Sequence, residues 1–147
     1  MLLERIDKVF SFAATEIKEV QIKTISTPVK TIVHEDPKIK VHLYGTVNKG
    51  ALAEEIAHVK ENILTVEVKP KKRYRFFNFN MGQDFALNLE LYLPADYKNN
   101  LCFDTVSGSV DTADLFLNRL EFHSISGGLW TRKIQTKKCK CKTSFTF

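Results

Sequence analysis

The sequence predicts an all-β domain that is built, at least in part, as a right-handed β-solenoid. Two observations predict this fold class. Apolar and polar residues alternate along most of the chain, and a short motif after residue 100 returns nineteen residues later. Alternation places successive side chains on opposite faces of a strand. A repeat of about twenty residues is typical of stacked β-coils.

The composition indicates one folded domain with an uneven distribution of charge. A chain of 147 residues, 44% hydrophobic and 27% charged, is long enough to bury a core and is not typical of disorder. Six of its 22 basic residues lie after residue 128, where there is no acid, which leaves 16 basic against 17 acidic residues before that point. The body is therefore balanced, and it shows no basic face of the kind that nucleic-acid readers carry.

The chain begins with a lead-in over residues 1–14. The segments after it alternate apolar and polar residues with a period of two. Helical patterning is scarce. Residues 1–10 and 51–60 are the best helix candidates, and the second is short enough to favour a helical turn or a loop. Alternating segments end at prolines such as Pro70 and Pro94, because proline removes a ladder donor. The clearest predicted strands are residues 20–24, 38–43, 63–68 and 85–93.

The recurring motif occupies residues 101–110 and 120–129. The strings LCFDTVSGSV and LEFHSISGGL share Leu, Phe, a hydroxyl residue, a β-branched residue and Ser-Gly at matching positions. Glycine reaches positive φ cheaply, and a serine hydroxyl can satisfy a backbone group freed at a bend. Neither serine has the Gly-x-Ser-x-Gly context of a nucleophile elbow. The Ser-Gly pairs are therefore interpreted as the corners of successive coils: Ser107 with Gly108, and Ser126 with Gly127.

A third coil should bring apolar residues to positions 139 and 141, where the sequence has Cys139 and Cys141. Cysteine can act as a small buried hydrophobe, so residues 130–147 are interpreted as a basic, degenerate last rung or tail. Acids and the Ser-Gly pair are both lost after Gly128. This loss prompts the hypothesis that the segment is out of register with an older repeat, through truncation or a change of reading frame.

Residues 91–97, residues 101–110 and the second Ser-Gly pair together resemble the bacterial putative-adhesin family, whose repeat domain is called a toast-rack fold. The shared pattern is a flanked Leu-Pro followed by repeated Thr-x-Ser-Gly, and the resemblance covers residues 15–129. It implies a single-sheet, right-handed β-helical domain. It also implies a role in interactions at the cell surface or in the envelope stress response, and it supplies no catalytic motif.

The residues that could carry chemistry are expected to be structural or solvent-exposed. Cys139 and Cys141 could join a histidine at zinc, but no third ligand is visible in the sequence. No catalytic, cofactor-binding or metal-binding residue is therefore assigned, and no cofactor is expected. The histidines stand in no metal-binding spacing and are expected to be solvated: His34, His42, His58 and His123.

One basic and aromatic stretch, residues 69–79, stands out in the body of the chain. Interleaved cations and rings can grip single-stranded nucleic acid. The same stretch also suits a loop that covers the end of a solenoid, which we favour because the rest of the body has no basic surplus. The partner-binding residues assigned to this loop are Lys71, Lys72, Arg73, Tyr74 and Arg75.

These observations favour a non-enzymatic binding or scaffold module for a protein or cell-envelope partner, with edge strands that could also support self-association. Two alternatives stay open. Single-stranded nucleic-acid binding would use residues 69–79 and the basic tail, and its affinity would fall steeply with salt. A carbohydrate-active β-solenoid would need carboxylates clustered along one ladder, and the candidates are Asp104, Asp111, Asp114 and Glu121.

The N-terminus has no uninterrupted apolar core of signal-peptide length, and no apolar run is long enough to span a bilayer. A cytoplasmic location is therefore expected, with envelope association through partners.

Overall fold

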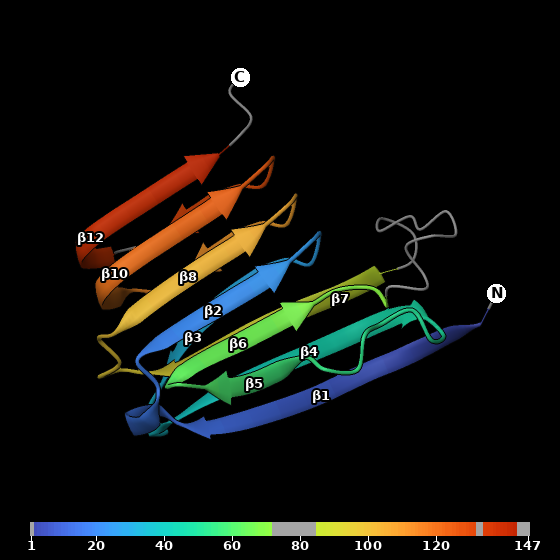
Figure 1. The fold of residues 1–147 in the computed structure, drawn as a ribbon, viewed down its shortest axis with the longest axis horizontal. Helices are drawn as coiled ribbons and strands as arrows, with labels where there is room; N and C mark the ends of the chain where they lie inside the picture. Colours follow the sequence, from blue (N-terminus) through green and yellow to red (C-terminus); the bar gives the residue numbers. More distant parts are fainter. Residues whose placement is uncertain (1, 72–84, 132–133, 144–147) are drawn as a thin grey trace.

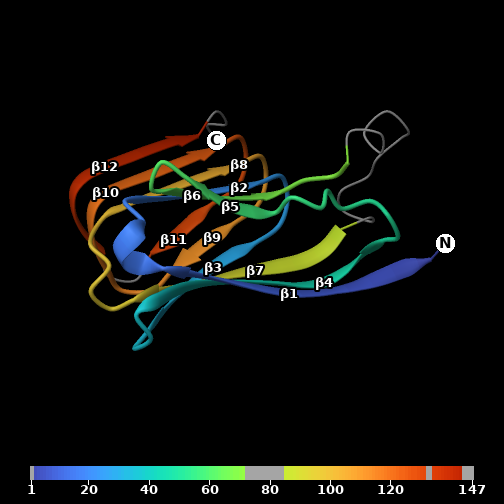
Figure 2. The ribbon, with the colours of Figure 1, turned by 60° about the horizontal axis from the view of Figure 1, so that its bottom comes forward.

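The structure, a computed structural model, describes residues 2–71, 85–131 and 134–143 and consists of two six-stranded β-sheets (Figure 1). The sheets pack face to face (Figure 2), and a 3-10 turn at Ala14–Glu16 is the one helical element in the described residues. No described helix has the length and apolarity needed to cross a membrane. The all-β prediction is confirmed, whereas the expected single sheet is wrong.

Each sheet combines strands from distant parts of the chain. In spatial order, sheet A contains β1 (Leu3–Ala13), β4 (Lys38–Asn48), β7 (Phe85–Pro94), β3 (Val29–His34), β9 (Val110–Thr112) and β11 (Leu129–Thr131). Sheet B, given from the opposite end of the stack, contains β12 (Ile134–Thr143), β10 (Leu115–Ser124), β8 (Asn100–Thr105), β2 (Glu19–Thr24), β6 (Ile63–Val68) and β5 (Ala57–Lys60).

Both sheets are mixed. β1, β4 and β7 pair antiparallel at one end of sheet A, and β5 pairs antiparallel with β6 at one end of sheet B. The other neighbours are parallel. In this parallel part the chain crosses three times from sheet B to sheet A, from β2 to β3, from β8 to β9 and from β10 to β11 (Figure 2). We call each of these strand pairs a rung, and β12 lies beside β10 in sheet B as the next strand.

The strand register follows the motif found in the sequence. Leu120 pairs with Leu101 on one side and with Cys139 on the other, so both steps span nineteen residues. On its far side Leu101 pairs with Val20, which makes residues 20–29 a further rung that the nineteen-residue offset does not predict. Its string VQIKTISTPV resembles LCFDTVSGSV, but Thr27 replaces the corner glycine and 81 residues separate the two copies.

The core lies between the sheets and is filled by alternate residues of each strand. Phe103 and Phe122 occupy equivalent positions in neighbouring rungs and are almost completely buried. Burying each large apolar side chain contributes about 1.5–3 kcal/mol. The neighbouring inward row, two residues earlier in each strand, contains Val20, Leu64, Leu101 and Leu120, all buried.

The single-sheet prediction is wrong because each rung turns at its corner and enters the opposite layer. A strand with one apolar face needs a cover for that face, and here sheet A covers sheet B. The long segment between the first and second rungs adds β4 and β7 to sheet A and β5 and β6 to sheet B.

Both helix candidates form other structures. Residues 3–13 form β1, which pairs with β4 over its whole length, because cooperative sheet pairing outweighs weak helix propensity. In the second segment Leu52 bridges Pro70, and residues 57–60 form β5. A two-residue turn connects β5 to β6, and its residues Glu61 and Asn62 both have positive φ, as hairpin turns of this length require.

Candidate functional site

The outer face of sheet B displays polar side chains in rows, because β2, β8, β10 and β12 run parallel and in register. Each row crosses the sheet at one level. The first row is Glu19, Asn100, Arg119 and Lys138, the second is Gln21, Cys102, Glu121 and Lys140, and the third is Lys23, Asp104 and His123.

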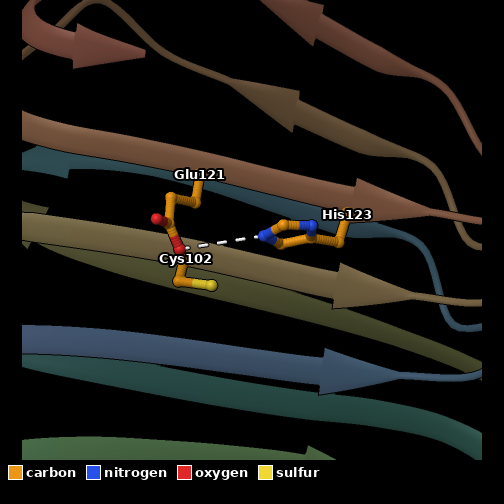
Figure 3. A group of neighbouring side chains, drawn as sticks. All are labelled: Cys102, Glu121 and His123. Atoms are coloured by element: carbon orange, nitrogen blue, oxygen red, sulfur yellow. Dashed lines mark ion pairs between the residues drawn. The ribbon is translucent and has the colours of Figure 1, made fainter. Parts of the chain in front are cut away.

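Three of these side chains form a cluster that we call the Cys-Glu-His cluster, defined as Cys102, Glu121 and His123 (Figure 3). Glu121 and His123 lie two residues apart on β10 and share its outer face, while Cys102 lies opposite Glu121 on β8. One possible ligand atom from each residue lies within 4.8 Å of the other two, and Nε2 of His123 is 3.7 Å from Oε2 of Glu121. All three side chains are half-buried. A thiol, a carboxylate and an imidazole thus converge on one point.

The Cys102 sulfur lies among negatively charged side chains. Burial, followed by the charges of Glu121, Glu19 and Asp104, raises the pKa of the Cys102 thiol to about 11. The thiol is therefore protonated at neutral pH and is a poor nucleophile. Arg119 offsets part of the negative charge, because it lies 2.6 Å from Glu19 and 3.8 Å from Glu121. The cluster suits cation binding better than covalent catalysis.

The predicted corner residues lie where the chain crosses between the sheets. Ser107 donates a hydrogen bond to the carbonyl of Ile25 at 3.3 Å, and Ser126 donates one to the carbonyl of Val106 at 3.5 Å. Each hydroxyl therefore reaches back to the neighbouring rung. Neither serine is hydrogen-bonded to a histidine in the part of the chain that is described.

The corner glycines are needed for a reason other than the expected one. Neither Gly108 nor Gly127 has positive φ, so that expectation is wrong. A Cβ on Gly108 would lie 2.6 Å from the carbonyl oxygen of Thr27, and one on Gly127 would lie 2.0 Å from the carbonyl oxygen of Gly108. The rungs approach too closely at this corner for any side chain.

The predicted partner-binding loop is described only at its start. Lys71 donates its backbone N–H to the carbonyl of Ala51, and its ammonium lies 3.9 Å from Glu54. The other assigned residues, Lys72, Arg73, Tyr74 and Arg75, lie outside the described residues.

The histidines differ more than the sequence indicates. His58 is exposed, whereas His42 lies between Asp7 at 2.7 Å and Glu90 at 3.2 Å. The hydrogen bond to Asp7 raises the pKa of His42, and the hydrogen bond to Glu90 raises it further. The expectation of a freely solvated His42 is therefore wrong, because the antiparallel pairing of β1, β4 and β7 brings two carboxylates to it.

The carboxylates that a carbohydrate-active site would need are divided between the sheets. Asp104 and Glu121 lie on sheet B, whereas Asp111 lies on β9 of sheet A and Asp114 lies between β9 and β10. The four do not line one ladder.

Among the described strands, β12 lies at the edge of sheet B at one end of the stack (Figure 1). Cys139 and Cys141 continue the inward rows but are exposed, because sheet A has no described strand beyond β11 to cover them. Their sulfurs lie 3.7 Å apart, and no third ligand joins them among the described residues. The expected burial of these cysteines is therefore wrong.

The surroundings of β12 are basic and partly apolar. Lys137, Lys138 and Lys140 are exposed on the strand itself. Beside its start lies a cleft of about 450 Å³ that includes Phe116, which is 50% exposed, and Trp130 on β11 is 67% exposed.

Comparison with known families identifies the fold. The family model described as Toastrack DUF4097 matches residues 17–146, which include every strand from β2 to β12. The chain belongs to the Toastrack family. The resemblance found in the sequence is confirmed, and the match extends past residue 129 to include β12.

The solved structures that align with this Toastrack chain share little sequence with it. A putative cell adhesion protein from Clostridium sporogenes aligns with a TM-score of 0.50 and 7% identity, over 95% of this chain and 100% of that one. A putative adhesin from Bacteroides fragilis gives 0.47 and 12%, over 94% and 76% of the two chains. A putative lipid binding protein from Parabacteroides distasonis gives 0.47 and 15%, over 93% and 62%. None of the curated proteins compared with the chain matches it.

Proposed function

We propose that this Toastrack chain is a non-enzymatic binding module in the cell envelope or at its surface. Its parallel rungs form a short β-solenoid, and the edge of β12 binds an acidic, extended segment of a protein partner. The observation that carries the proposal is the position of β12, a ten-residue strand with exposed lysines, at the edge of sheet B as described. An edge strand presents unpaired N–H and C=O groups, to which an extended segment can add as a further strand.

The charge of β12 indicates the kind of partner. Lysines on an edge strand oppose pairing between two copies of that strand, because like charges would meet across the new ladder. An acidic strand would meet no such repulsion, and Lys137, Lys138 and Lys140 would attract it. The β12 edge therefore favours an acidic partner over self-association.

The other edges suit this role less well. β5 and β11 are only four and three residues long, which limits the ladder that a partner can form. β1 is eleven residues long, but it carries both acids and bases and so selects neither sign of charge.

The test measures binding of a fluorescent ten-residue peptide of alternating Thr and Glu by anisotropy, with hydrogen exchange of the β12 amides as a second readout. We expect binding to the full chain and slower exchange along β12. The triple variant K137E/K138E/K140E should weaken binding at least ~10-fold, because rim charges of a complementary interface change association strongly. The matched control K18E/K30E/K60E changes the net charge equally, at exposed lysines outside β12.

Equal weakening by both triple variants would show that net charge alone attracts the peptide, which contradicts pairing at β12. Tighter binding of oligothymidine than of the acidic peptide, with a steep loss of affinity in salt, would instead support the nucleic-acid alternative. A lysine-containing peptide of the same pattern should not bind.

A further inference from the structure

We propose that the Cys-Glu-His cluster on the outer face of sheet B binds one divalent ion of the zinc class. This inference is independent of the partner proposed for β12, because the cluster lies on the face of the sheet and the partner would bind at its edge.

The geometry of the three groups is close to that of a metal site. Three atoms that are at most 4.8 Å apart leave a position for an ion no more than about 2.8 Å from each of them, whereas zinc bonds to S, N and O ligands are about 2.0–2.3 Å long. Small rotations of the Glu121 and Cys102 side chains would close that difference. The backbone need not move, because the register of β8 and β10 already places the three residues together.

The ligand types select the class of ion. A thiolate and an imidazole favour zinc and related ions, whereas magnesium and calcium favour sites made of oxygen ligands. On binding, the Cys102 thiol would release its proton to solvent and the ion would take its place. The outer face is open to water, which would supply the fourth ligand of a tetrahedral site.

The environment of the cluster also supports a cation. Within the described residues the imidazole of His123 makes one ion-pair contact, the 3.7 Å approach to Glu121, which is longer than a hydrogen bond. Glu19 and Asp104 add negative charge nearby. Arg119 and the lysine opposite Glu121 in the next strand oppose a cation. Arg119 lies 3.8 Å from Glu121 in the cluster, but its shorter contact, at 2.6 Å, is with Glu19 outside it.

The test begins from a variant without the two exposed cysteines, C139S/C141S, so that any thiolate ligand is Cys102. We expect this full-length variant, after removal of metal with a chelator, to bind one equivalent of Zn²⁺ by calorimetry. With Co²⁺ in place of Zn²⁺, we expect a thiolate-to-metal charge-transfer band. Zn²⁺ should also raise its melting temperature.

Adding C102S should abolish the charge-transfer band, and adding H123Q should weaken Zn²⁺ binding at least ~10-fold, since changes to groups that merely support a ligand already cost 10–100-fold. Adding H58Q, at an exposed histidine on β5 and outside the cluster, should change neither readout. Circular dichroism of each apo variant checks that it folds. The proposal is overturned if C139S/C141S binds no Zn²⁺ at micromolar concentrations, or if C102S and H123Q bind as well as their parent.

Discussion

At the corner of a rung, a threonine or serine side chain accepts a hydrogen bond from the N–H of a glycine three residues later. Thr105 accepts from Gly108 at 2.9 Å, and Ser124 accepts from Gly127 at 2.6 Å. Thr24 of the first rung donates its hydroxyl to Thr105 at 3.0 Å, in the interior. The Thr-x-Ser-Gly pattern thus has a local cause, because its first residue closes the turn and its last lets the next rung approach.

The substitution Gly127→Ala tests this close approach. The new Cβ would clash with the backbone of Gly108, which no side-chain movement relieves, so we expect a loss of about 1–3 kcal/mol in the free energy of unfolding. Gly128→Ala is the matched control. Its Cβ would make only ordinary contact with Trp130, at 3.5 Å, and φ is not positive there.

Urea unfolding followed by circular dichroism measures both variants. A loss for Gly128→Ala as large as for Gly127→Ala would show that any side chain in this turn is harmful, and that the close packing of rungs is not the cause.

At the scale of the strands, the antiparallel end of sheet A is linked by one histidine. His42 on β4 contacts Asp7 on β1 and Glu90 on β7, and Tyr92 donates a hydrogen bond to Glu90 at 3.0 Å. Tyr44 lies against the His42 ring, with centroids 4.8 Å apart. Three neighbouring strands are therefore connected by charge on their outer face as well as by the backbone ladder.

This link predicts a pH dependence of stability. The pKa of His42 is raised in the folded protein, so its contribution is fully present below the unfolded value of 6.5 and is lost as pH rises through the folded pKa. The difference in unfolding free energy between the wild type and His42→Gln should therefore shrink as pH rises from about 6 to about 8.

The measurement is urea unfolding at a series of pH values, with His58→Gln as the control, since His58 is exposed and its nearest carboxylate oxygen is 3.8 Å away. The control should stay close to the wild type throughout. If the His42→Gln difference did not vary with pH, the two carboxylates would not be acting on a charged imidazole.

At the scale of the molecule, much of the fold follows from the sequence pattern. The alternation predicts strands that the structure contains at residues 20–24, 38–43 and 63–68, and the nineteen-residue offset equals the register between β8 and β10. The second sheet does not follow from the pattern, because alternation along one strand does not say which other strand covers its apolar face. The rung at residues 20–29 does not follow either, because Thr27 replaces the glycine and a long segment separates it from its relatives.

The candidate site is harder to predict than the fold. Cys102 and His123 lie 21 residues apart in the sequence, and no metal-binding spacing relates them. The repeat nonetheless contains a signal for this cluster. Aligning the two copies at an offset of nineteen pairs Cys102 with Glu121, and His123 is the next residue on the same face of that strand. Only the parallel, in-register pairing of β8 and β10 turns that alignment into a contact.

The whole fold depends on the stacking of the first rung on the second, because it joins residues 81 positions apart and orders sheet B from β6 to β12. Nuclear Overhauser contacts between backbone protons of isotope-labelled protein test it directly. We expect contacts between Val20 and Leu101, between Leu101 and Leu120, and between Leu120 and Cys139. Contacts that place Leu101 beside any strand other than β2 and β10 would contradict the fold and the cluster built on it.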